Sequence, residues 1–333
     1  MKHMPYYILF SITLLMGTLM SLSSNHWIYI WMGFETNLMS FIPIILQSSN
    51  NQETEAAIKY FLIQALGSSM ILLSSMSILV YKYSMFSFNS MLYLLIFSLM
   101  TKMGAAPFHF WLPQIMMSVS WITCMLLATW QKIAPIFIIL SISSLYMNKL
   151  FMIMAVLGTI TGALGGLNQT HLRPLLAYSS IAHLGWMIAS CSISSFSTIL
   201  YFLIYSFMTL PIMLLMFMVS SKSNYISSIS NMSIPIVLSL MILFLSLAGL
   251  PPLLGFLPKW NMIKVMVSQN MLLYITIMII SSLISLFYYL SIFFNLFLNQ
   301  SKTMLYNKNT NTSSMINMSL ISTMTLGMAP LIF

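Results

Sequence analysis

Long apolar stretches dominate this chain and leave few folds open to it. The 333 residues are 59% hydrophobic and only 5% charged, with a mean hydropathy of +0.95. A soluble domain, by contrast, carries about 25% charged residues, and a helix needs about 20 apolar residues to cross the hydrocarbon layer of a membrane. The sequence therefore predicts an all-α, polytopic membrane protein with no soluble domain between its spans.

About eleven stretches are long and apolar enough to cross a membrane as helices. We expect them at residues 5–22, 26–46, 57–81, 88–106, 119–142, 147–167, 173–191, 195–220, 233–254, 270–297 and 315–333. The first follows Lys2 without a clear cleavage site, so we interpret it as a retained helix and not as a signal peptide. Two shorter stretches, 107–118 and 255–268, are expected to form half-helices or re-entrant segments. We interpret the whole chain, 1–333, as a single transmembrane domain.

The basic residues favour one orientation of these spans. An odd number of spans places the two chain ends on opposite sides, and the side richer in Lys and Arg is the inside. With the N-terminus inside, the inside loops hold Lys2, Arg173, Lys222, Lys302 and Lys308, with Lys59 near one, and the outside loops hold Lys82, Lys149 and Lys264. The net charge of +9 is scattered over loops and helices, so it does not indicate a nucleic-acid partner.

Two segments share the pattern Gly-x-x-Pro-x5-Pro, one from Gly104 to Pro113 and the other from Gly249 to Pro258. Proline inside a helix removes a backbone hydrogen bond and clashes with the preceding turn, so each segment predicts a broken membrane helix. About five spans lie between the two starts, which gives the segments opposite directions across the membrane. This pattern is typical of an inverted-topology repeat, in which the broken helices mark a transport site.

Four charged side chains lie inside the predicted spans: Glu35, Lys102, Lys132 and Lys259. Each costs about 2.5–3.5 kcal/mol or more at membrane depth, so such residues indicate an ion or proton path. Two of the lysines flank the predicted breaks, where non-helical backbone is tolerated if it lines a hydrated cavity. Lysine can also give up its proton in a buried site, whereas arginine stays protonated.

Purely structural roles are also open for some of these residues. Lys259 lies near a helix end and could extend its ammonium group to the membrane surface. Glu35 could be a structural partner of a buried lysine, and at about 4 Å such a pair attracts by about 4 kcal/mol. His183 lies in an apolar helix, where a proton relay and a hydrogen-bonded core residue are both open.

The other polar residues give weaker signals. We expect Glu53 and Glu55 to be surface charges on a loop, and Cys124 and Cys191 to be small core residues. The sequence has no metal motif, no glycine-rich phosphate loop and no nucleophilic triad. We therefore expect no metal, redox cofactor or nucleotide in this chain.

Four segments of the sequence resemble one family: Trp31–Asn37, Lys102–Pro113, Ala177–Trp186 and Ser246–Trp260. They are similar to the chain 2 family of mitochondrial NADH dehydrogenase (ubiquinone), in its shortened animal form. This family is related to the other antiporter-like subunits of complex I and to multi-subunit cation/proton antiporters. The resemblance covers nearly the whole chain, with an antiporter-like core at about residues 24–290.

The resemblance assigns roles to the residues already selected. It implies that Glu35 is the family's buried glutamate, Lys102 the lysine of the first broken helix, Lys132 the central lysine and Lys259 the lysine of the second broken helix. One departure is Pro174, where related sequences usually have a basic residue. Without that second basic residue, the case for a contact made by two charges of this loop is weaker. The charged residues inside the membrane spans are unaffected.

The resemblance also implies a place and a function. It implies a core subunit of complex I in the mitochondrial inner membrane, with its N-terminus in the matrix and part of the proton path inside it. The 34 methionines and the single arginine are typical of animal mitochondrial genes. NADH, FMN, iron–sulfur clusters and ubiquinone are expected in other subunits, and the expected partners are further membrane subunits and phospholipids such as cardiolipin. A cation/proton antiporter subunit without a redox partner and a purely structural scaffold remain as alternatives.

Overall fold

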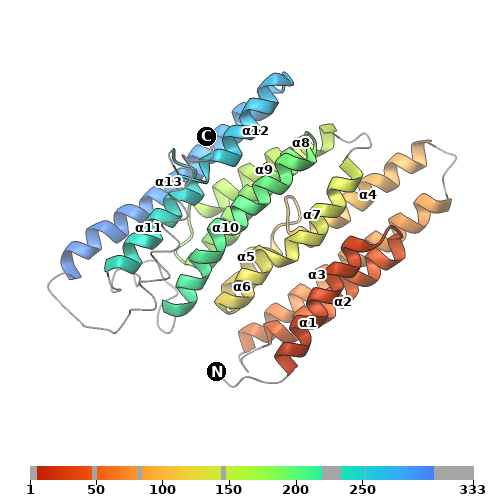
Figure 1. The fold of residues 1–333 in the computed structure, drawn as a ribbon, viewed down its shortest axis with the longest axis horizontal. Coiled ribbons are helices and arrows are strands. Elements are labelled where there is room, and N and C mark those ends of the chain that lie inside the picture. Colours follow the sequence, from red (N-terminus) through yellow and green to blue (C-terminus); the bar gives the residue numbers. More distant parts are fainter. Residues whose placement is uncertain are drawn as a thin grey trace. The chain divides into compact units, whose positions relative to one another are not determined.

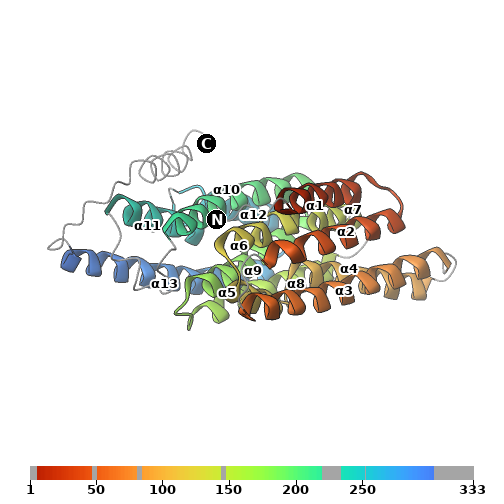
Figure 2. The same ribbon diagram turned by 90° about the horizontal axis from the view of Figure 1, so that it is seen from below.

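The computed structural model describes residues 6–46, 51–80, 85–143, 148–219, 234–251 and 253–303. The chain divides into two compact units, the first with residues 1–123 and 130–145 and the second with residues 124–129 and 146–333. Figures 1 and 2 show α-helices in both units, and the described residues contain no strand. The prediction of an all-α fold is confirmed.

The first unit is built on the N-terminal helices. It holds α1 (Tyr6–Ser23), α2 (Trp27–Ile45), α3 (Asn51–Val80), α4 (Met85–Met103), α5 (Trp111–Ser118) and α7 (Trp130–Ser143), and α6 (Trp121–Ala128) is shared by both units. Helix α2 packs against α1 and α3, α3 packs against α4 and α5, and α7 packs against α1 and α4. The ribbons of α1 and α2 run side by side in both views (Figures 1 and 2).

The second unit is built around α9. It holds α8 (Asn148–Gly166), α9 (Leu172–Cys191), α10 (Ser195–Val219), α11 (Ile234–Ala248), α12 (Phe256–Ser268) and α13 (Leu272–Thr303). Helix α9 packs against α8, α10, α12 and α13, and nearly all of its residues are buried. A side chain on α9 is therefore enclosed by protein on several sides.

Glycines let neighbouring helices of each unit approach closely. A Cβ atom at Gly33 of α2 would lie 2.7 Å from the backbone nitrogen of Ser21 in α1. In the second unit, a Cβ atom at Gly162 of α8 would lie 2.5 Å from the backbone nitrogen of Ala182 in α9. Small residues of this kind are the usual way in which membrane helices bring their backbones into contact.

The helices agree with the predicted spans over most of the chain. Each span expected between residues 5 and 297 coincides with a described helix, or with α6 and α7 in the case of 119–142. The last expected span, 315–333, lies outside the described residues. Among the residues that the structure describes, seven helices are long and apolar enough to cross a membrane. The polytopic membrane fold is confirmed, and the number of eleven spans stays a prediction.

Candidate functional site

The first predicted break lies between α4 and α5 and begins with a glycine in the left-handed region. Helix α4 ends at Met103, and Gly104 follows with φ of +70°. The N–H of Gly104 donates to the carbonyl of Thr101 at 3.2 Å, and the next N–H donates to the carbonyl of Met100 at 3.0 Å. This pair of bonds is the Schellman motif, which ends a helix and favours glycine at this position. The sequence pattern therefore identified a real helix break.

Lys102 lies in the last turn of α4 and its side chain is buried, at 5% exposure. Its ammonium lies 4.4 Å from the centroid of the Phe34 ring, the geometry of a cation–π contact. Glu35 is half-buried on the same helix as Phe34, and its charge acts on the Lys102 ammonium through space. Both side chains are described, and they form no direct ion pair in this structure. The glutamate and the lysine are thus in one neighbourhood but not in contact.

Amide side chains surround Lys102. Gln64 of α3 donates its amide to the Lys102 carbonyl at 3.2 Å. Gln131 of α7 donates to the Asn37 side-chain oxygen at 3.0 Å and accepts a long hydrogen bond of 3.5 Å from the Tyr60 hydroxyl. Together they enclose a small polar cavity, lined by Phe34, Asn37, Leu38, Tyr60, Gln64, Lys102, Gln131 and Pro135. A polar cavity of this kind can hold water next to the lysine.

The sequence reasoning missed these amides although it selected the lysine. Gln64, Gln131 and Asn37 all lie inside apolar spans, where an amide is costly to bury without a hydrogen-bond partner. That cost is a weaker signal than the cost of a charge, but it points to the same cavity.

Lys132 lies in the first turn of α7 and is 1% exposed. A single residue, Thr129, separates α7 from α6. Its hydroxyl donates to the Met125 carbonyl at 2.8 Å, in competition with its own N–H at 3.1 Å, and such back-bonding bends helices. The segment expected as one helix is thus interrupted before Lys132, as well as being weakened by Pro135 after it.

The second predicted break, between α11 and α12, has the same turn as the first. Helix α11 ends at Ala248, and Gly249 follows with φ of +83°. Its N–H donates to the Ser246 carbonyl at 3.0 Å, and the Leu250 N–H donates to the Leu245 carbonyl at 3.4 Å. The helices α4 and α11 therefore end in the same backbone turn, which supports the predicted internal repeat.

Lys259 lies in the first turn of α12 and its side chain turns back to the break. It is 8% exposed, and its ammonium donates to the Ala248 carbonyl at 3.0 Å. Within the second unit it is enclosed by the protein. The alternative in which Lys259 extends to the membrane surface does not fit this geometry.

His183 of α9 lies in the same unit as Lys259 and is 4% exposed. Its Nδ1 atom lies 3.0 Å from the Tyr201 hydroxyl, so it is hydrogen-bonded, as a core histidine should be. It also lines a cavity with Lys259 and a set of hydroxyl side chains from three helices: Thr159, Ser179, Ser281, Ser282, Ser285, Tyr288 and Tyr289. Hydroxyls both donate and accept hydrogen bonds, so a water molecule in this cavity has partners beside the lysine.

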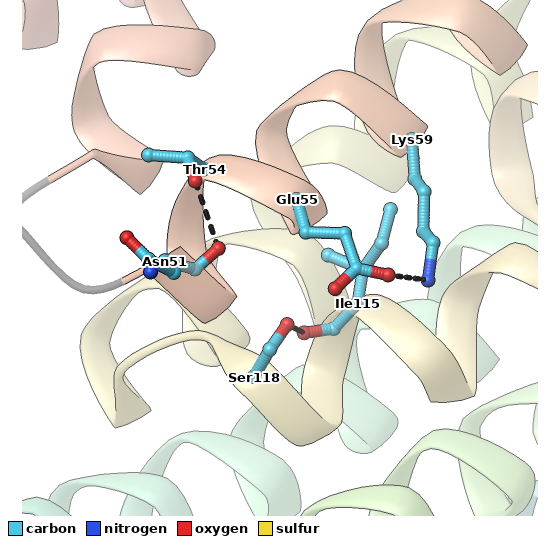
Figure 3. Close-up of polar contacts among 6 residues, drawn as sticks. All are labelled: Asn51, Thr54, Glu55, Lys59, Ile115 and Ser118. Carbon is cyan, nitrogen blue, oxygen red and sulfur yellow. Dashed lines mark hydrogen bonds and ion pairs between the residues drawn. The ribbon is translucent and has the colours of Figure 1, made fainter.

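Two of the three acids lie near the start of α3. Glu55 and Lys59 form an exposed ion pair with 2.6 Å between Oε1 and Nζ (Figure 3). Glu53, on the same helix, is buried at 7% exposure. The expectation of two surface charges on a loop is right for the exposure of Glu55 and wrong for Glu53, because the helix already begins at Asn51 and one of its faces is buried.

Within the described part of the chain, the structure shows neither a metal site nor a disulfide. Both cysteines, Cys124 and Cys191, are buried and free. Over the described ranges, no group of three or more His, Cys, Asp or Glu side chains is placed to hold a metal ion. The chemistry that the arrangement offers is proton transfer among lysines, a histidine, hydroxyls and amides.

Comparison with known proteins identifies the family. The family profile described as "NADH:quinone oxidoreductase/Mrp antiporter, TM" matches residues 24–285. The chain belongs to this family. Within the NADH:quinone oxidoreductase/Mrp antiporter family, its similar relatives include NADH-ubiquinone oxidoreductase chain 2 of Locusta migratoria, with 44% identity over 91% of this chain and 87% of the relative. The proteins of the same name from Lumbricus terrestris and Anopheles gambiae are each 42% identical, over 84% and 94% of this chain and 83% and 92% of the relatives.

Solved structures share the fold of this chain at low sequence identity. A chain of respiratory complex I from Thermus thermophilus has a TM-score of 0.83 and 22% identity, over 97% of this chain and 77% of that one. A chain of an archaeal membrane-bound sulfane sulfur reductase has a TM-score of 0.82 and 18% identity, over 98% and 72%. A chain of the Mrp complex from Dietzia has a TM-score of 0.78 and 15% identity, over 86% and 59%. The resemblance seen in the sequence is confirmed.

Proposed function

We propose that this chain is a core membrane subunit of NADH:ubiquinone oxidoreductase and carries part of its proton path. The observation that carries the proposal is the placement of buried lysines at both helix breaks, in a chain 44% identical to a protein named as chain 2 of that enzyme. Protonatable residues inside a membrane protein mark ion and proton paths. Electron transfer from NADH to ubiquinone takes place in other subunits, which hold the FMN and the iron–sulfur clusters.

The proposed path uses the residues selected from the sequence. A change in a neighbouring subunit alters the interaction of Glu35 with Lys102, and the Lys102 ammonium changes its protonation. The proton then moves along water to Lys132 and onward to Lys259, with His183 as a relay. The polar cavity at Lys102 and the hydroxyl-lined cavity at Lys259 support this assignment, because each gives a lysine a place for water.

The setting of the chain belongs to the same proposal. Its partners are other membrane subunits of the complex, including further antiporter-like subunits, and phospholipids such as cardiolipin. The N-terminus lies in the matrix, and the chain forms one transmembrane domain with its core at residues 24–290. No cofactor is bound by this chain itself.

Replacing Lys102 or Lys132 with Met tests the path. Met keeps much of the side-chain volume but cannot carry a proton, so transfer through the path should slow by about 100-fold or more. Inner-membrane vesicles that contain the variant complex should translocate fewer protons for each NADH oxidised. Lys59→Met, at an exposed lysine, is the control and should leave this ratio unchanged. A normal ratio in both path variants, with normal assembly, would overturn the proposal.

A native gel decides between this function and the antiporter alternative. Mildly solubilised inner membrane is separated, probed for this chain and stained for NADH dehydrogenase activity. Migration of the chain with a large active band is the expected result. Migration away from that activity would favour a cation/proton antiporter without a redox partner.

A further inference from the structure

The two helix breaks share one backbone turn but treat their lysines differently. At the first break, the Lys102 ammonium lies over Phe34, and the backbone carbonyl of Lys102 is satisfied by the neutral amide of Gln64. At the second break, the Lys259 ammonium itself satisfies the free carbonyl of Ala248. The ammonium group of Lys259, on α12, is thus hydrogen-bonded to the C-terminal end of α11.

This difference matches the distribution of acids in the chain. The only acids are Glu35, Glu53 and Glu55, and all three belong to the first unit. The second unit contains no Asp or Glu anywhere in its sequence. The C-terminus of a helix carries about half a negative charge from its unpaired carbonyls. Within its own unit, the end of α11 is therefore the counter-charge that Lys259 has.

Gly249 makes the approach of the lysine to this helix end possible. A Cβ atom at position 249 would lie 2.9 Å from Lys259 Nζ, 3.2 Å from its Cδ and 3.3 Å from its Cε. At the matching position of the first break, a Cβ atom on Gly104 would meet Leu112 Cδ1 at 2.9 Å and the Trp111 ring at 3.1 Å, with no lysine among these nearest atoms. Both glycines serve the left-handed turn, but only Gly249 also leaves room for an ammonium group.

We infer that the carbonyl end of α11 is the counter-charge of Lys259 and that Gly249 is the positioning residue that keeps the ammonium on it. The inference rests on the proposed function and deepens it at this site. An amine donates hydrogen bonds to a carbonyl in its charged and in its neutral form. Lys259 can therefore gain and lose a proton without leaving its place, which a lysine held by a carboxylate ion pair does less readily.

The test compares Gly249→Ala with Gly104→Ala, each alone and combined with Lys259→Ala, in the assembled complex. Both alanines bear the strain of a left-handed backbone, which should shorten the half-life of the complex on heating by about 5- to 30-fold. Gly249→Ala should shorten it by a further ~10-fold, because its Cβ displaces the ammonium from the Ala248 carbonyl. In the Lys259→Ala background this extra loss should disappear, whereas the effect of Gly104→Ala, whose Cβ meets Leu112 and Trp111, should be the same in both backgrounds.

The second readout is the number of protons translocated per NADH oxidised. Gly249→Ala should lower this ratio to the level of Lys259→Ala, and the double variant should be no lower. An equal effect of Gly249→Ala on the half-life with and without Lys259 would overturn the inference, as would a normal ratio for Gly249→Ala beside a low one for Lys259→Ala. A normal ratio for Lys259→Ala itself would count against the proposed function, and the half-lives would still decide the role of Gly249.

Discussion

At the residue scale, the position of a lysine within an apolar span correctly predicted that its side chain is buried. The partners of each charge could not be predicted from the sequence. Lys102, Lys132 and Lys259 are all buried, as their positions in apolar spans predicted. The sequence indicates Glu35 as the partner of a buried lysine, yet the ammonium of Lys102 lies over Phe34 instead. Neighbours on one helix can both reach a lysine, and only the packed side chains decide between them.

Tyr201 offers a residue-scale test of the histidine relay. Tyr201→Phe removes the hydroxyl that holds His183 Nδ1 and should cost about 0.5–1.5 kcal/mol of stability. If this bond positions His183 for proton transfer, the variant should also pump fewer protons per NADH. His183→Ala should lower pumping to the same degree, and the double variant should be no worse. An additional loss in the double variant would show that Tyr201 acts apart from the histidine.

At the scale of elements, glycines with a left-handed backbone end α4 and α11, and other glycines allow neighbouring helices to pack closely. The pattern Gly-x-x-Pro placed the ends of α4 and α11, because a left-handed glycine and a following proline stop a helix whatever surrounds it. The split between α6 and α7 was not expected. It occurs at Thr129, whose hydroxyl bonds back to the Met125 carbonyl, a contact that often bends helices.

The contact between α8 and α9 gives an element-scale prediction. Gly162→Ala would place a Cβ atom 2.5 Å from the Ala182 nitrogen and 2.7 Å from the Tyr178 carbonyl oxygen, and backbone atoms cannot move aside cheaply. Overpacking of this kind costs about 1–3 kcal/mol. The amount of assembled complex on a native gel should fall. Leu164→Ala, at a 54% exposed position on the same helix, should assemble normally, and equal assembly of both variants would show that the two helices have room to separate.

At the scale of the whole molecule, the chain distributes its charges unequally between two units. All acids belong to the first unit, while buried lysines occur in both. The proposed proton path therefore begins in a unit where a carboxylate acts on a lysine and ends in a unit where backbone carbonyls take that role. This asymmetry exists although the two breaks have the same backbone turn.

The orientation of the chain is a whole-molecule prediction that labelling can check. Lys59→Cys should react with a membrane-impermeant maleimide from the matrix side, and Lys149→Cys and Lys264→Cys from the opposite side, because the distribution of basic residues favours an inside N-terminus. The native cysteines, Cys124 and Cys191, are buried and should give little background. The reverse pattern of labelling would show that the chain has the opposite orientation in the membrane.

The sequence by itself determined the helices, the two breaks and the charged residues of the candidate site. These are local properties, since apolar length, glycine and proline act within a few residues of chain. The tertiary structure alone decided what each charge meets. The Gln131 amide reaches Asn37 across 94 residues, and Gln64 reaches the carbonyl of Lys102 across 38. Such contacts depend on how helices pack, and no local pattern in the chain encodes which side chain will fill the space beside a lysine.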